Sequence, residues 1–179
     1  MYARSRPKFD PRSAMPTYQQ EVPTVNANAE ISHLSGIEQL RAILAGKTGY
    51  EGIAKTLDIH PVSAEEGFVV FEGSPSKAVY NPIGSVHGGY AATLLDTVMG
   101  CAVHSRLKVG QAYTTLELKI AYHRPLTDSS GPVRAEGRVV SSGRRAAFAE
   151  GKLFDKEGTL CATATATCLV FARGDGTRA

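Results

Sequence analysis

The chain has 179 residues, of which 42% are apolar and 21% charged, ordinary values for a soluble globular protein of one domain. The net charge of +3 would suit a small anionic ligand, but tryptophan is absent and no aromatic-and-basic pattern appears, so we expect no nucleic-acid partner. The three cysteines are an odd number and form no C-x-x-C pair, so neither a disulfide framework nor a zinc ribbon is indicated, and we expect free thiols in a reducing cytoplasm.

The first 30 residues are rich in Pro, Ser, Asn and Gln and have no apolar periodicity, so we expect a flexible N-terminal arm over 1–30. The opening stretch lacks the apolar segment of a secretory signal, which favours a cytoplasmic protein. A folded domain is predicted over 31–173, followed by a short tail over 174–179.

Helical spacing of apolar residues begins after the arm and predicts a helix over 35–47, with Ser35 as its N-cap and Gly46 at its end. Shorter elements are expected next: a turn or helix over 53–57 and strands over 59–61 and 67–72. A loop with two prolines then leads to a long apolar helix that starts near Gly88 and ends before Gly110.

The long helix has roughly the length of a membrane span of ~20 residues, but it contains Asp96. An aspartate at the centre of a bilayer costs about 2.5–3.5 kcal/mol on insertion scales. The segment also carries Gly88, Gly89, Gly100 and His104. We therefore expect a buried helix and no membrane partner.

After this helix the apolar period changes from 3.6 to 2. Four segments alternate in this way and are predicted as strands: TTLELKIAYHRP, PVRAEGRVVSS, RRAAFAEGKLFD and LCATATATCLVFA. In the first of them, Leu116 is expected to share one face with Leu118, and Thr115 to lie on the other. No helix separates the four strands, so they should be antiparallel and joined by hairpins.

One long helix can bury its apolar surface against such a sheet only if the sheet curls round it. Alanines and glycines on the inward faces of the strands suit a close approach of helix and sheet. The predicted fold class is therefore α+β: a hotdog fold, in which a long central helix is wrapped by a curved antiparallel sheet of about five to six strands.

Asp96 is the one firmly charged side chain between His87 and Arg106. It could be a helical aspartate satisfied by a neighbour such as Thr97. Its apolar surroundings would instead remove water from the carboxylate and make it a better proton acceptor. A catalytic use of Asp96 is the second interpretation.

The sequence His87-Gly88-Gly89 stands at the start of the same helix. The first turn of a helix has unpaired N–H groups at the positive end of its dipole, and glycine lets a ligand approach the backbone closely. An oxyanion forming on an acyl carbonyl could therefore bind to the Gly88 N–H. A plain glycine turn is the other interpretation.

Gly88 and Asp96 are eight residues apart, or about 12 Å along one helix, so a single carbonyl cannot touch both. Either the two features are unrelated, or two chains build the site. In a two-fold dimer with antiparallel helices, the Gly-Gly end of one helix would meet Asp96 of the other, giving two equivalent sites.

The segment NPIGSVHGGYAATLLD resembles the signature of hotdog-fold acyl-CoA thioesterases of the PaaI type, in the 4-hydroxybenzoyl-CoA thioesterase superfamily. The strand TTLELKIAYHRP, the turn SSGRR and ATAT in the last strand support the resemblance, which covers about residues 36–171. It implies an acyl-CoA substrate, a homodimer or a homotetramer made of two dimers, and no metal or other cofactor, since coenzyme A is part of the substrate.

The resemblance also implies roles for individual residues. Asp96 matches the catalytic carboxylate, as general base or as nucleophile, and Gly88 matches the oxyanion donor. The other matched positions are His87 and Asn81, which would hold the thioester and the water; Thr114, a hydroxyl beside that water; and Gly89, Ser141, Arg144 and Arg145, which would contact substrate or the phosphates of coenzyme A. A solvated hairpin end is the alternative for the two arginines.

Two other functions remain open at this point. A hotdog hydratase or dehydratase would resemble D-x4-H on the central helix, whereas this chain has Cys101 at that position. A non-catalytic module that binds acyl-CoA would give binding without thiol release. A nucleophilic pair of Cys101 and His104 is conceivable, but both lie beyond Asp96. The acyl group is undefined, because the pocket depends on how Tyr90, Met99 and the loops pack.

Overall fold

The computed structural model describes residues 30–47 and 52–173. Nearly all of the predicted arm and the whole tail lie outside the described residues, so those two predictions stay predictions. The elements in chain order are α1 (Gly36–Leu44), α2 (Ile53–Thr56), β1 (Ile59–Glu65), β2 (Phe68–Gly73), the 3-10 turn η1 (Lys77–Val79), α3 (Gly88–His104), β3 (Gln111–Tyr122), the 3-10 turn η2 (Asp128–Ser130), β4 (Val133–Ser142), β5 (Ala146–Phe154) and β6 (Leu160–Ala172).

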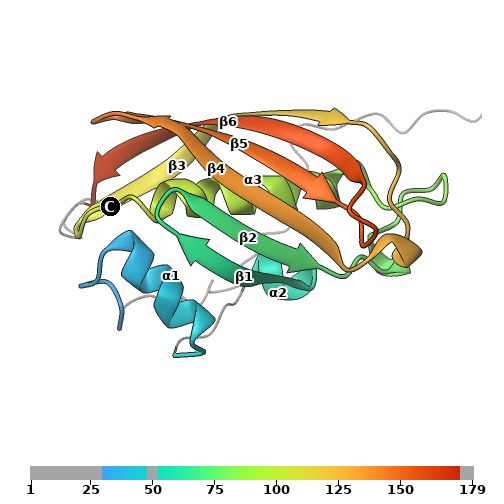
Figure 1. Ribbon diagram of the computed structural model, residues 1–179, viewed down its shortest axis with the longest axis horizontal. Coiled ribbons are helices and arrows are strands. Elements are labelled where there is room, and N and C mark those ends of the chain that lie inside the picture. Colours follow the sequence, from blue (N-terminus) through green and yellow to red (C-terminus); the bar gives the residue numbers. More distant parts are fainter. Residues whose placement is uncertain (1–29, 48–51, 174–179) are drawn as a thin grey trace, which may run out of the picture.

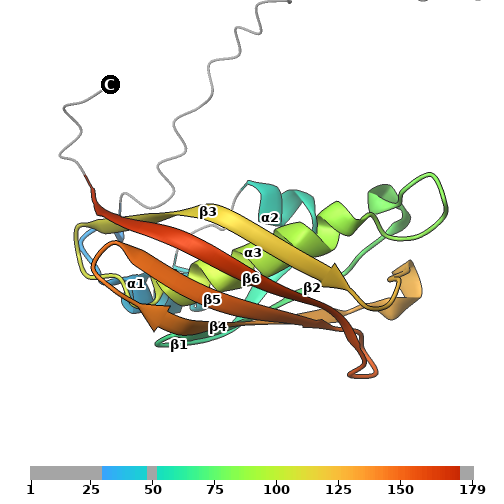
Figure 2. The same ribbon diagram turned by 90° about the horizontal axis from the view of Figure 1, so that it is seen from above.

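The described strands form one six-stranded antiparallel sheet in the order β1-β2-β4-β5-β6-β3, and the sheet curves round α3 (Figures 1 and 2). The helix presents an apolar face to the sheet. Its fully buried residues are Leu94, Leu95, Val98, Met99 and Ala102. This arrangement confirms the predicted hotdog fold.

Small residues on the central strands allow the helix to approach the sheet closely. A Cβ on Gly137 of β4 would collide with the backbone carbonyl of Val98, and one on Gly151 of β5 would lie 3.0 Å from Leu95. Ala135 and Ala149 are buried on the same face. The glycines and alanines of the strand patterns are therefore what bring α3 into contact with the sheet.

One predicted connection is wrong. Consecutive strands β4, β5 and β6 are neighbours, as expected of hairpins, but β3 pairs with β6 and β4 pairs with β2. The segment 123–132 thus leads from one edge of the sheet back to its middle. The pairing of β4 with β2 joins strands from before and after α3, so that one continuous sheet encloses the helix.

The edge strand β3 contains a bulge at Leu116. Thr115 pairs with Cys168 and Glu117 with Thr167, so Leu116 has no partner position in β6. A bulge adds one residue and reverses the alternation beyond it. Thr115 consequently faces α3, and Leu116 is 63% exposed. Thr115 and Leu116 therefore lie on the faces opposite to those predicted, because the bulge inserts one residue into the alternation.

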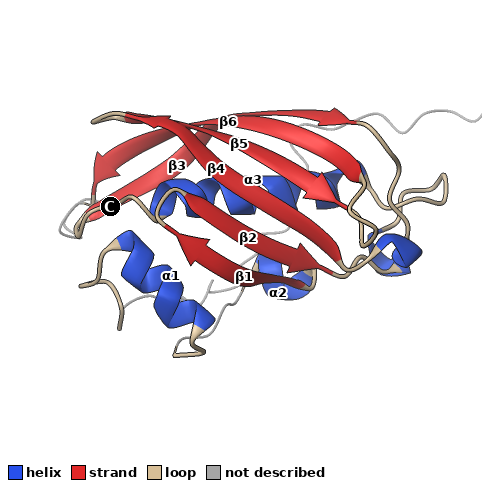
Figure 3. Ribbon diagram, in the orientation of Figure 1, coloured by secondary structure: helices blue, strands red, loops and turns tan. Residues whose placement is uncertain are grey.

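Helix α1 packs across the far end of α3, beside β1 (Figure 3). Gly36 donates its N–H to the carbonyl of Leu107 at 3.0 Å, and a Cβ on Gly36 would collide with the carbonyl of His104. The buried Gln39 side chain lies 3.1 Å from His104 Nε2. Within the described ranges, no helix is long and apolar enough to cross a membrane.

Candidate functional site

Asp96 lies on a half-buried side of α3. Its Oδ1 accepts a hydrogen bond of 3.0 Å from the hydroxyl of Thr115 on β3. The neighbouring Thr97 does not satisfy it, since its hydroxyl donates to the carbonyl of Thr93 at 2.7 Å. In the part of the chain that the structure describes, the second carboxylate oxygen of Asp96 accepts no hydrogen bond, so one oxygen is fixed and the other is open to a ligand.

The hydroxyl beside Asp96 therefore belongs to Thr115, one position after the expected residue. Thr114 is exposed and pairs with Leu169, whereas Thr115 pairs with the buried Cys168. Successive residues of a strand point to opposite faces, which turns the Thr114 side chain away from α3. Its sequence-derived role beside the catalytic water has no support from this placement.

Two thiols lie near the carboxylate. Burial and the nearby Asp96 charge raise the pKa of Cys101 to about 12. Burial also raises the pKa of Cys168, together with Asp96 and against the opposing effect of its hydrogen bond with Thr115. Both thiols are protonated at neutral pH, and thiolate chemistry at this position is disfavoured.

The His87-Gly88-Gly89 turn begins α3, as predicted. Nδ1 of His87 accepts a hydrogen bond of 2.8 Å from the Gly89 N–H and so caps the helix with an imidazole. A Cβ on Gly89 would lie 2.9 Å from that same nitrogen, so glycine leaves room for the ring. Among the described residues, the Gly88 N–H has no acceptor, as the oxyanion role requires.

Asn81 organises the loop that precedes this turn. Its Oδ1 accepts from the N–H groups of Ile83 at 3.1 Å and Ser85 at 3.2 Å, and its Nδ2 donates to the Ser85 hydroxyl at 3.0 Å. The His87 N–H donates to the Val79 carbonyl at 2.8 Å. The Asn81 side chain thus holds the loop in shape, in addition to any contact with substrate.

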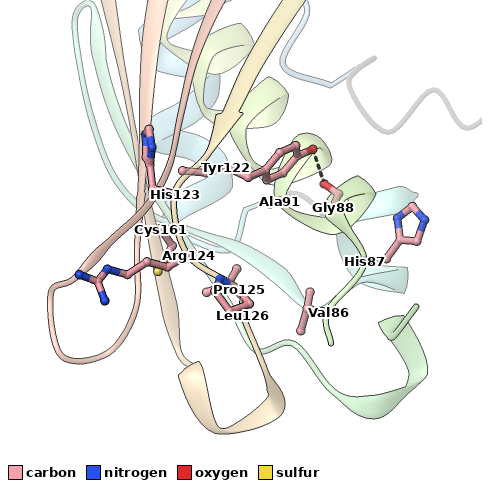
Figure 4. Close-up of a pocket in the computed structure, with 11 residues that line it drawn as sticks. Val86, His87, Gly88, Ala91, Tyr122, His123, Arg124, Pro125, Leu126 and Cys161 are labelled. Carbon is pink, nitrogen blue, oxygen red and sulfur yellow. Dashed lines mark hydrogen bonds between the residues drawn. The ribbon is translucent and has the colours of Figure 1, made fainter. Parts of the chain in front are cut away.

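A cavity of about 350 Å³ opens beside Gly88 (Figure 4). Its walls come from the start of α3, the end of β3, the segment after β3 and the start of β6. Apolar lining residues include Val86, Ala91, Pro125, Leu126 and Ala162. In Figure 4, the His87 ring lies to one side, apart from the other labelled side chains. The end of α3 that carries the free N–H therefore has room for a bound group.

Comparisons with known proteins point to one family. A family model described as the thioesterase superfamily matches residues 83–162. The proofreading thioesterase EntH of Klebsiella pneumoniae subsp. pneumoniae is 33% identical over 99 residues, which are 55% of this chain and 71% of that protein. The phenylacetic acid degradation-related protein of Ralstonia eutropha JMP134 is 30% identical, with a TM-score of 0.66 over 72% of this chain and 97% of its own.

The chain belongs to the thioesterase superfamily. The structure of the E. coli PaaI protein has the same fold, with a TM-score of 0.66 over 77% of this chain and 95% of that one, at 21% identity. The protein is thus a PaaI-like thioester hydrolase with the hotdog fold. This confirms the family and the enzyme class that the motif around Asp96 indicated.

In this thioesterase, Gly89 adjoins Gly88, but the other three residues predicted to contact substrate or coenzyme A lie far from Gly88 of the same chain. Ser141, Arg144 and Arg145 are exposed at the turn between β4 and β5. That turn adjoins the end of α3, where Ser142 and Gly143 line a small cavity with Val103. Figure 1 shows this turn and the start of α3 at opposite ends of the molecule.

Two residues expected to shape the acyl pocket of the thioesterase lie in its core instead. Met99 is fully buried, and Tyr90 is 3% exposed, with its hydroxyl against Gly73. Conversely, Thr115 and Tyr122 were missed. Thr115 is concealed by the bulge, which leaves no mark in the alternation. The Tyr122 hydroxyl donates to the Gly88 carbonyl at 3.0 Å, a contact across 34 residues that strand spacing alone does not reveal.

Proposed function

We propose that the protein hydrolyses acyl-CoA thioesters to a free acid and coenzyme A, as a homodimer whose two sites each use both chains. Asp96 of one chain activates water or attacks the carbonyl, and the Gly88 N–H of the other binds the oxyanion. The observation that carries the proposal is the pairing, on one helix, of a carboxylate fixed by Thr115 and a glycine turn with a free N–H.

The chemistry requires little beyond these two groups. A thioester carbonyl is a good electrophile and a thiolate a good leaving group, so one carboxylate and one oxyanion donor account for the reaction. Thr115 holds one oxygen of Asp96 and leaves the second to act on water or on carbon. The proposal needs no metal or other cofactor, and it applies equally to Asp96 as base and as nucleophile.

The separation of the two groups favours a site shared by two chains. Eight helical residues place Asp96 about 12 Å from Gly88 of its own chain, too far for one carbonyl. The edge strand β3 beside Asp96 exposes the apolar residues Leu116 and Tyr122, which is consistent with a covered edge. An antiparallel arrangement of two α3 helices would bring each Gly88 to the Asp96 of its partner. Pairing of two such dimers into a tetramer is compatible with the same site.

The same arrangement gives the basic turn a role. In an antiparallel pair, the β4–β5 turn at the far end of one α3 approaches the start of the other α3. Arg144 and Arg145 would then meet the phosphates of a coenzyme A whose thioester lies on the partner's Gly88, with Ser141 nearby. This placement supports the substrate class without defining the acyl group.

Hydration is less compatible with these side chains than hydrolysis. A hydratase would need a second acid–base group five residues after Asp96, and Cys101 stands there with its pKa raised to about 12. A thiol with so high a pKa stays protonated at neutral pH, so it cannot accept a proton from water as a general base. Thioester hydrolysis needs only the carboxylate.

The test is release of coenzyme A from a panel of aromatic, short-chain and medium-chain acyl-CoAs, followed with a thiol reagent. Asp96→Asn should lower kcat by about 10²–10⁴, whereas Asp58→Asn is the matched control. Asp58 lies in the left-handed region with φ of 53°, which asparagine also adopts. Parent-like turnover by Asp96→Asn would refute the assignment, and binding of acyl-CoA with no thiol release would identify a binding module.

A further inference from the structure

The peptide unit that joins Gly88 to Gly89 is held at both ends by side chains. Its carbonyl oxygen accepts a hydrogen bond of 3.0 Å from Oη of Tyr122, and its N–H donates to Nδ1 of His87 at 2.8 Å. Tyr122 is the last residue of β3, and His87 is the N-cap of α3. One side chain therefore ties the edge of the sheet to the first turn of the helix (Figure 4).

This double attachment matters because the turn consists of two glycines. Glycine has the widest range of backbone conformations, and the first turn of a helix is where the intrahelical hydrogen bonds of its N–H groups are missing. The nitrogen of Gly88 and the carbonyl carbon of Gly88, whose oxygen accepts the Tyr122 hydrogen bond, are bonded to the same Cα. Fixing the following peptide plane therefore restricts the direction in which the Gly88 N–H points.

The tyrosine ring also packs directly against Gly88. A Cβ built on Gly88 would lie 3.1 Å from Oη of Tyr122 and 3.2 Å from its Cζ. The ring thus occupies the space that any side chain at position 88 would need. Tyr122 is 56% exposed and lines the cavity beside Gly88, so core packing alone does not account for its position.

We propose that Tyr122 is a positioning residue: through its hydrogen bond to the Gly88 carbonyl, it keeps the Gly88 N–H directed at the developing oxyanion. The inference rests on the proposed role of Gly88. An oxyanion donor acts on charge that appears only in the transition state. Loss of its orientation therefore lowers kcat, whereas loss of a simple substrate contact raises KM.

The first test is Tyr122→Phe, which removes the hydroxyl and keeps the ring. We expect kcat to fall about threefold to tenfold, as for loss of one neutral hydrogen bond, with KM within about twofold and an unchanged pH profile. Tyr80→Phe is the matched control, because the Tyr80 hydroxyl donates to Asp128 at 2.8 Å and does not touch Gly88. Unchanged kcat in Tyr122→Phe, or a raised KM with normal kcat, would overturn the proposal.

The second test is Gly88→Ala, which keeps the N–H but forces the Tyr122 ring to move. Its loss of kcat should not multiply with that of Tyr122→Phe in the double variant, because both changes disturb one contact. Fully multiplicative losses would mean that the two residues act separately, and would contradict the inference.

A third measurement does not depend on activity. Amide hydrogen exchange at Gly89, observed by NMR in the full chain, should be severalfold faster in Tyr122→Phe and unchanged in Tyr80→Phe. An unaltered exchange rate at Gly89 in Tyr122→Phe would contradict the inference even if the protein is an active thioesterase. Absence of hydrolysis in the wild type would count against the proposed function, while the exchange data would still decide whether Tyr122 holds the turn.

Discussion

The Asp96 carboxylate is oriented from another element of the fold, because its partner Thr115 lies on β3 and not on α3. A hydroxyl that donates to one carboxylate oxygen fixes the plane of the group and so the direction of the other oxygen. This kind of support can only be recognised once strand and helix are placed together. It makes the Thr115 hydroxyl part of the catalytic geometry under the proposed function.

Replacement of Thr115 separates the hydroxyl from the shape of its side chain. Thr115→Val removes the donor and should lower kcat about tenfold, in the range of a hydrogen bond to a charged group. Thr115→Ser retains the donor and should stay within about threefold of the wild type. Thiol release under saturating acyl-CoA measures both. If Thr114→Val shows the larger loss, the sequence-derived assignment to Thr114 is the right one.

Tyr90 is a different case, because its buried hydroxyl has no hydrogen-bond partner among the described residues. Burial, with a smaller contribution from Asp58, raises the pKa of this phenol, so the group is neutral. A buried polar group without a partner costs free energy. Tyr90→Phe should therefore leave the free energy of unfolding unchanged or raise it by up to ~1 kcal/mol, as measured by urea denaturation. A clear loss of stability would indicate a partner for the hydroxyl.

At the level of elements, a polar contact between the side chains of Gln39 and His104 attaches α1 to α3. The Gln39 amide donates to the Leu34 carbonyl at 2.8 Å, so its oxygen is the acceptor and neutral His104 donates from Nε2. Burial, and then the charge of Arg173, lower the pKa of His104 below its ordinary value of 6.5. The folded state thus binds this proton less readily than the unfolded chain.

The sign of the pH dependence follows from that depressed pKa. The contribution of neutral His104 to stability is complete above about pH 6.5 and is lost as the pH falls through the lower folded-state pKa. The free energy of unfolding should therefore decline as the pH falls below about 6.5, and decline less in His104→Gln. Urea denaturation at several pH values makes the comparison. An identical decline in the two proteins would exclude His104 as the cause.

The same elements show which parts of the fold follow from sequence patterns. The period of α3, the apolar faces of β4 and β6, and the glycines that face the helix are local features, and all were predicted. The crossover from β3 to β4 was not, since it depends on pairing between strands far apart in the chain. The bulge at Leu116 escaped for a related reason, because one extra residue between two alternating runs resembles continued alternation. The position of Thr115, and with it part of the site, depends on that bulge.

At the scale of the whole molecule, a site shared by two chains predicts that two inactive variants can restore activity when they form a mixed dimer. Asp96→Asn lacks the carboxylate, and Gly88→Pro lacks the N–H. The backbone suits proline at this first helical position, since His87, with φ of −61° and ψ of 136°, already has the conformation favoured before proline. The Tyr122 ring, which lies 3.1 Å from where a Cβ on residue 88 would be, must shift to make room for the proline ring. A mixed dimer of these variants would contain one intact site and one that lacks both groups.

Complementation between the two variants is therefore the direct test of a shared site. Random pairing gives half mixed dimers with one working site each, so roughly a quarter of the wild-type activity should return on co-expression. Each variant expressed alone is the control, with circular dichroism to verify that it folds. A site confined to one chain would give no recovery in the mixture.

The protonation state of the cysteines has a practical consequence for the assays that follow thiol release. The pKa values of Cys101, Cys161 and Cys168 are each raised, chiefly by burial, and these are all the cysteines in the chain. Disulfide reagents and alkylating agents react with thiolates. The native enzyme should therefore consume such reagents slowly, so colour that develops promptly with acyl-CoA can be assigned to the released coenzyme A, with little background from the protein itself.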